Sequence, residues 1–124
     1  MDTYTVSTIA MCTRLKRKVF LAKGIAERFT EIITVIILSH DSEITAIEFL
    51  PYGAIFELKH PEALDVNALV REIRLATSKP IRDTYMELWH MPSLWIREFY
   101  LHNGCKTADT NKEILEYYNK QKSR

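Results

Sequence analysis

The chain has 124 residues, of which 47% are hydrophobic and 27% charged, and its formal net charge is +1. This length and composition predict one globular domain over residues 1–124, with enough apolar side chains to build its own core. A charge this close to zero excludes a strong overall attraction to nucleic acid, so any such binding has to come from local clusters of charge.

A strand, a helix and a hairpin are predicted in the first half of the chain. Residues 3–12 are rich in β-forming side chains and predict the strand. Residues 43–50 and 54–60 predict the two arms of a β-hairpin around a Pro-Tyr-Gly turn. Between them, residues 25–40 predict a helix. Its apolar stripe is formed by Ile25, Phe29, Ile32, Ile33 and Ile36.

The second hairpin arm, AIFELKH, alternates as a half-buried strand should. Its core-facing side chains are expected to be Ala54, Phe56 and Leu58. The opposite face carries the residues between and beside them, namely Gly53, Ile55, Glu57 and Lys59. That face should be in water, so the isoleucine in its middle is unexpected.

The second half of the chain predicts a helix over residues 63–79, which Pro80 is expected to end because proline has no N–H to donate. Residues 81–89 predict a short helical turn, and residues 93–104, dense in aromatic side chains, predict a fourth strand. The core-facing side chains of the helix are expected to be Val66, Leu69, Val70 and Ile73.

The last predicted element is a helix over residues 111–122. Thr110 and Glu113 have the spacing of a capping box, in which each side chain accepts a hydrogen bond from an amide at the helix N-terminus. The residues expected to pack onto the sheet are Ile114, Leu115 and Tyr118. A different face of the helix is shared by Glu113, Tyr117 and Gln121.

The order of strand, helix, hairpin, helix, strand and helix predicts an α+β fold. We expect a ferredoxin-like (RRM-like) antiparallel sheet with helices on one face, plus a C-terminal helix that carries Tyr117. Considered alone, a tyrosine in this position is typical of an amphipathic helix with an interfacial aromatic side chain.

Basic residues gather in two places along the sequence. The first cluster follows the first strand and contains Arg14, Lys16, Arg17 and Lys18. The second belongs to the region of the second helix and contains Arg71, Arg74, Lys79 and Arg82. Either cluster alone is typical of a solvated face, whereas the two together would meet the phosphates of hairpin DNA or structured RNA.

Neither a disulfide framework nor a zinc motif is expected, because Cys12 and Cys105 are too few and too far apart in sequence. Two free thiols are typical of a reducing cytoplasm. The first residues lack the basic start of a signal peptide, and the apolar run at residues 32–38 is too short to span a bilayer. We therefore expect a cytoplasmic protein that does not enter a membrane.

Five segments, in the same order, resemble the single-tyrosine HUH transposases, the small enzymes of the simplest bacterial insertion sequences and their REP-associated relatives. These segments read MCTRLKRKVF, IEFLPYGAIFELKHP, ALVREIRLATSKPIRDTYMEL, SLWIREFYLHNG and EILEYYNKQK. The last one is similar to the family's closing Val-x-x-Tyr-Ile-x-x-Gln. This resemblance matches Tyr117 to the nucleophile and Gln121 to a metal ligand.

The resemblance also implies a role for the outer face of the second hairpin arm. In the family this arm reads Pro-Asp-His-bulky-His, and both histidines point at one divalent metal because side chains two apart share a strand face. Here Tyr52 stands at the aspartate, Gly53 at the first histidine and Ile55 at the second. Neither glycine nor isoleucine can bind a metal, so two of the three ligands implied by the resemblance are missing.

In the family the tyrosine oxygen attacks a single-stranded DNA phosphodiester and forms a 5′-phosphotyrosine. A phenol with a pKa of about 10 is a poor nucleophile at neutral pH, and the metal compensates by neutralising the phosphate. The remaining candidate ligands are Gln121 and Glu57, which lies on the strand face of Ile55. They would hold Mg²⁺ or Mn²⁺ if the site were active; otherwise no cofactor is expected.

The resemblance therefore implies a transposase-like nucleic-acid-binding protein that does not cleave DNA. Its partner would be single-stranded or hairpin DNA, or a structured RNA. Two alternatives stay open: an active single-strand DNA transposase with an atypical metal site, and a protein-interaction or structural role on the same fold. The resemblance also implies a homodimer that pairs through a strand edge, either that of residues 3–12 or that of residues 93–104.

Overall fold

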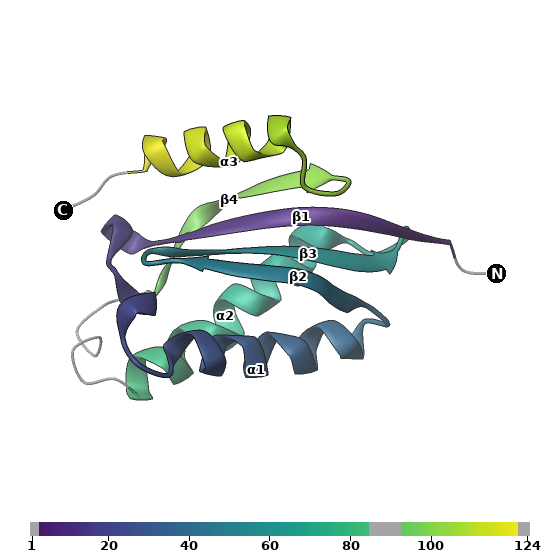
Figure 1. Ribbon diagram of the computed structural model, residues 1–124. Helices are drawn as coiled ribbons and strands as arrows, with labels where there is room; N and C mark the ends of the chain where they lie inside the picture. Colours follow the sequence, from purple (N-terminus) through teal and green to yellow (C-terminus); the bar gives the residue numbers. More distant parts are fainter. Residues whose placement is uncertain (1–2, 85–92, 122–124) are drawn as a thin grey trace.

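The computed structural model describes residues 3–84 and 93–121, which form one four-stranded antiparallel sheet and three α-helices. The elements are β1 (Tyr4–Thr13), α1 (Ile25–Ser39), β2 (Glu43–Leu50), β3 (Gly53–Pro61), α2 (Val66–Thr84), β4 (Trp95–Asn103) and α3 (Ala108–Lys120). The strand order is β2-β3-β1-β4, with α1 and α2 on one face of the sheet and α3 across the other (Figure 1). The expected ferredoxin-like α+β fold with an added C-terminal helix is confirmed.

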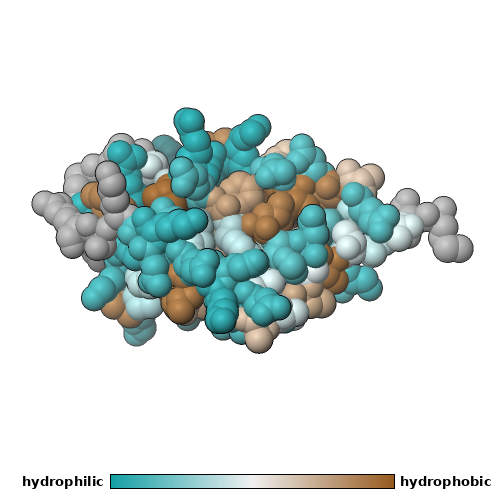
Figure 2. All heavy atoms as spheres, turned by 90° about the horizontal axis from the view of Figure 1, so that it is seen from above, coloured by the Kyte–Doolittle hydropathy of each residue, from teal (hydrophilic) through white to brown (hydrophobic). Residues whose placement is uncertain are grey.

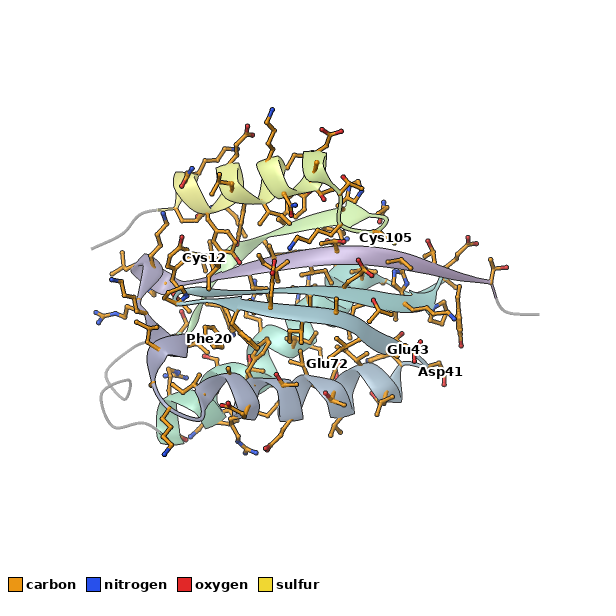
Figure 3. All side chains as sticks on the ribbon, viewed as in Figure 1. Cys12, Phe20, Asp41, Glu43, Glu72 and Cys105 are labelled. Carbon is orange, nitrogen blue, oxygen red and sulfur yellow. The ribbon has the colours of Figure 1, made fainter. Side chains whose placement is uncertain are left out.

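The main core lies between the sheet and the helices α1 and α2. Phe29 of α1, Phe56 of β3 and Ile73 of α2 are buried in it. Phe20 lies in the short 3₁₀ turn that precedes α1 (Figure 3). The centroid of its ring is 5.7 Å from that of Phe29 and 5.7 Å from that of Trp95. The predicted core faces of β3 and α2 are confirmed. In α1 the buried stripe consists of Ile25, Phe29, Ile33 and Ile37.

Helix α2 continues through Pro80 to Thr84, so the expected helix end at this proline is wrong. Proline costs the helix one hydrogen bond, but the next residue, Ile81, is fully buried in the main core and keeps the last turn against the sheet. The rest of the helical turn predicted there, residues 85–89, lies outside the described residues. In the described part of the chain, no helix combines the length and the hydropathy needed to cross a bilayer.

Helix α3 begins at Ala108, three residues earlier than predicted. The capping box pairs Thr107 with Thr110 and does not involve Glu113, so that prediction is wrong. The Thr110 amide donates to the Thr107 hydroxyl at 3.3 Å, and the Thr107 amide donates to the Thr110 hydroxyl at 2.5 Å. A threonine can take the usual place of glutamate because its hydroxyl reaches the same amide. Outward-facing side chains of α3 are mostly hydrophilic (Figure 2).

Strand β1 lies between β3 and β4, so it offers no free edge to a second copy of the chain. Of the two edges expected for a homodimer, that of β4 remains. Strand β4 carries a bulge: between its pairs with Met11 and Thr13, residues 96–98 lie opposite the single Cys12. Side chains from α2 and from α3 both donate hydrogen bonds to carbonyl groups of this bulge.

Replacing Phe29 with alanine should lower the free energy of unfolding by about 3–5 kcal/mol, because the ring is fully buried among other aromatic rings. Urea denaturation followed by circular dichroism measures the change. Val35→Ala is the matched control, since Val35 lies on the same helix but is 70% exposed; it should change stability by less than about 0.5 kcal/mol. Equal effects of the two substitutions would contradict this core.

Candidate functional site

Helix α3 buries a second, smaller core on the face of the sheet opposite α1 and α2. This α3 core consists of Ala10, Cys12, Ile55, Ile114 and Tyr118. Ile114 and Tyr118 are buried as expected, but Leu115, expected to pack beside them, is 60% exposed. One residue advances the helix by about 100°, which turns Leu115 away from the sheet. The unexpected isoleucine of β3 is explained as well, because Ile55 faces α3 and not water.

Gly53 and Tyr118 meet in the α3 core so closely that the glycine has no room for a side chain. A Cβ atom on Gly53 would lie 2.6 Å from the Tyr118 hydroxyl oxygen and 2.6 Å from the Met11 carbonyl oxygen. The hydroxyl donates to the Met11 carbonyl at 2.8 Å, with the Ala54 carbonyl oxygen at 3.3 Å. Gly53 does not have a positive φ, so glycine is required here by the space that the Tyr118 hydroxyl and the Met11 carbonyl take, and not by the backbone conformation.

Two further tyrosines surround Tyr118. The Tyr52 ring meets it edge-on at a centroid distance of 5.5 Å, and the Tyr117 ring does so at 5.0 Å. Lys16 places its ammonium nitrogen 5.5 Å from the centre of the Tyr52 ring. Burial raises the pKa of Tyr118 well above its ordinary value, so the hydroxyl stays protonated and remains a donor. A tyrosine cluster thus fills the space beside Gly53.

Tyr117, the candidate nucleophile, uses its hydroxyl to attach α3 to the β4 bulge. The hydroxyl donates to the Glu98 carbonyl oxygen at 2.8 Å. Burial, and to a lesser extent the proximity of Cys12 and Glu98, raises the pKa of Tyr117 well above that of a free phenol. A catalytic phenol requires the opposite, either a lowered pKa or a neighbouring base. In this conformation the hydroxyl of Tyr117 has a structural use.

The candidate metal ligands do not come together within the chain. Gln121 follows the C-terminal end of α3, and its side-chain amide donates to the Tyr117 carbonyl oxygen at 2.7 Å. Glu57 lies at the other end of α3, where its carboxylate accepts from the Lys106 amide at 3.2 Å and from the Thr45 hydroxyl at 2.9 Å. The length of α3 separates the two by about 20 Å.

A divalent metal therefore does not fit the residues present. Gly53 has no space for a ligand, and Ile55 is apolar and packed under α3. Among the residues that the structure describes, no group of three histidine, cysteine, aspartate or glutamate side chains could hold a metal ion. The family's metal chemistry is for these reasons not assigned to this arrangement.

The basic residues selected from the sequence separate into two sets in the fold. Arg14, Arg71 and Arg74 come together in a groove between α2 and β4. The remaining ones do not line that groove: Lys16, Arg17, Lys18, Lys79 and Arg82. Arg97 of β4 lines it too and was missed in the sequence. Strand alternation could have found it, because this charge shares a strand face with the aromatic residues two positions away.

The sheet, the helix laid over it and the tyrosine on that helix agree with the family suggested by the sequence. The chain belongs to the IS200-like transposases: the sequence profile of this family, described as "Transposase IS200 like", matches residues 4–121. Among curated proteins, no sequence matches the chain significantly.

Two solved structures share the fold. One is a Deinococcus radiodurans R1 protein assigned as a transposase, with a TM-score of 0.87 and 16% identity over 100% of this chain and 95% of that one. The other is the REP-associated tyrosine transposase bound to a REP hairpin, with a TM-score of 0.62 and 17% identity over 92% of this chain. This chain covers 65% of that longer protein. At such identities the likeness concerns the fold.

Replacing Gly53 with alanine should destabilise the protein by about 1–3 kcal/mol, because the added methyl group displaces either the Tyr118 ring or the β1 backbone. Urea denaturation measures the loss. Lys59→Ala, an exposed position on the same strand, is the control and should cost less than about 0.5 kcal/mol. An unchanged stability of Gly53→Ala would mean that Tyr118 does not occupy this space.

The two thiols should react very differently, because α3 covers one and not the other. Cys12 is buried, and burial raises its pKa to about 11, whereas Cys105 is exposed near the other end of α3 (Figure 3). At pH 8 a thiol reagent should label Cys105 in the folded protein and both cysteines in denaturant, as mass spectrometry would show. Tyr118→Ala should expose Cys12. Rapid labelling of Cys12 in the wild-type protein would contradict the docking of α3.

Proposed function

We propose that this protein is a nucleic-acid-binding member of the transposase family that does not cleave DNA strands. The close contact between Gly53 and Tyr118 is the main support for this proposal. The tyrosine hydroxyl lies 2.6 Å from the point where a side chain on residue 53 would begin, so a metal ligand has no room there. The neighbouring position, Ile55, is apolar and 6% exposed.

Cleavage by a tyrosine requires that charge on the phosphate be neutralised and that the phenol be activated. The surroundings of Tyr117 support neither step. Its hydroxyl donates to a backbone carbonyl, burial raises its pKa, and the side-chain amide of Gln121 is bonded back to the helix. Binding without a covalent bond to DNA is the function that these groups support best.

The proposed ligand is single-stranded or hairpin DNA, or a structured RNA. Family membership over residues 4–121 supports it, as does the REP hairpin bound to the REP-associated tyrosine transposase of the same fold. Exposed arginines such as Arg14 and Arg71 supply the positive charge that phosphates need. Homodimerisation through the edge of β4 stays a prediction, which light scattering of the purified protein would test.

Tyr117→Phe should bind hairpin-bearing single-stranded DNA as well as the wild-type protein does, and neither should form a covalent DNA adduct with Mg²⁺ or Mn²⁺. The substitution removes one hydrogen bond to the Glu98 carbonyl, at a cost of about 0.5–1.5 kcal/mol of stability. Fluorescence polarisation measures binding, and denaturing gels of labelled DNA detect the adduct. Tyr100→Phe is the matched control, because it removes another hydroxyl that bonds to α3, through Glu113.

A metal-dependent adduct that forms in the wild-type protein and in Tyr100→Phe but not in Tyr117→Phe would show an active transposase and overturn the proposal. The absence of binding to every DNA and RNA at physiological salt would favour the protein-interaction role instead.

A further inference from the structure

A long groove runs between α2 and the outer edge of β4. It consists of two adjoining hollows with volumes of about 510 and 460 Å³. Arg74, Leu75 and Arg97 line both hollows, so the two form one continuous surface depression. Along α2 the lining extends from Asn67 to Ser78, which corresponds to about 16 Å of helix. We call this depression the arginine groove.

Among the described residues, the groove is lined by four arginines and by no acidic side chain: Arg14, Arg71, Arg74 and Arg97. Within residues 3–84 and 93–121, none of the four forms an ion pair with a carboxylate. Four like charges in one depression repel one another unless a ligand of opposite charge lies between them. The groove is therefore electrostatically complementary to a polyanion, although the chain as a whole is almost neutral.

Two of the four guanidinium groups are fixed in place by hydrogen bonds. Arg74 donates to the Arg97 carbonyl oxygen at 2.7 Å, and Arg14 donates to the Ser93 hydroxyl at 3.2 Å. Each uses one nitrogen in this way, and the planar group keeps further donors for a ligand. Arg71 and Arg97 have exposed side chains. Fixed guanidinium groups lose less conformational entropy when they bind a phosphate.

Apolar side chains lie between these charges. Leu75 is 69% exposed, and Phe99 is partly exposed in the half of the groove that contains Arg71. An apolar surface beside cationic groups suits a strand whose bases are unpaired, because the bases can pack on it while the phosphates meet the arginines. The bases of a duplex are stacked on one another and are not available for such packing.

We propose that the arginine groove binds a single-stranded segment of nucleic acid, DNA or RNA, through phosphates on the four arginines and bases against Leu75 and Phe99. This inference rests on the proposed function and assigns it a surface. The length of the groove along α2, about 16 Å, suits a short segment of one strand. Of the basic cluster that contains Arg14, the other members, Lys16, Arg17 and Lys18, do not line the groove, and the Lys16 ammonium lies over the Tyr52 ring.

The test compares Arg71→Ala/Arg97→Ala with Lys59→Ala/Lys112→Ala, a control that removes the same charge from exposed positions outside the groove. The probes are oligo-dT and oligo-U of about 15 nucleotides, a blunt duplex and a DNA hairpin without tails. For the single strands, two lost phosphate contacts should reduce the slope of log K against log salt by about 1.4, and the affinity by about tenfold or more at 0.1 M salt. The control should follow the wild-type protein.

The outcomes separate this inference from the proposed function. Single-strand binding that weakens equally in both variants would overturn the groove and leave the proposed function standing. If the groove variant lost affinity for the duplex but kept its affinity for the single strands, the assignment to single strands would be overturned. A wild-type dimer that dissociates in the groove variant, with unchanged affinity for every probe, would mean that the surface pairs two copies of the chain. If the wild-type protein bound none of the probes, the proposed function itself would fail.

Discussion

The hydrogen bond from the Tyr118 hydroxyl to the Met11 carbonyl connects the last helix to the middle of the sheet, and the candidate site depends on it. The bond can form only because residue 53 is glycine, since any side chain there would occupy the same space. It holds α3 against the sheet of the same chain, so that Ile55 and Ile114 are buried between them. The pair of glycine and tyrosine thus forms part of a small apolar core, in which a buried metal would lack ligands.

The β4 bulge extends this constraint to the other face of the sheet. The Arg97 carbonyl accepts from Arg74 of α2, and the next carbonyl, that of Glu98, accepts from Tyr117 of α3. Side chains from both helical layers therefore donate hydrogen bonds to neighbouring carbonyls of one edge strand. This lowers the number of unpaired backbone groups on that strand. The same bulge gives Tyr117 a structural purpose and helps to form the wall of the arginine groove. A tyrosine held in this way is useful without any catalytic role.

The periodicity of apolar residues was enough to predict the strands, the helices and the core faces of β3 and α2, because burial of an apolar stripe is a local property of the sequence. Pro80 was misleading because burial of the following Ile81 outweighs one missing hydrogen bond. The contact of Gly53 with Tyr118 could not be predicted, since it joins segments that are distant in sequence. Strand alternation could have placed Arg97 on the face of Trp95 and Phe99, but its proximity to Arg14 and Arg74 exists only after α2 has packed beside β4.

Tyr118 closes the position at which the family resemblance implies a metal, and paramagnetic broadening by Mn²⁺ would detect an ion bound there. In a methyl-labelled sample, the Ile55 and Ile114 signals report on the α3 core from both of its sides. A closed core predicts that millimolar Mn²⁺ leaves both signals no broader than those of Ile33, which lies in the main core below the sheet. Selective broadening of Ile55 and Ile114 would place a metal ion beside Gly53 and would contradict a closed site.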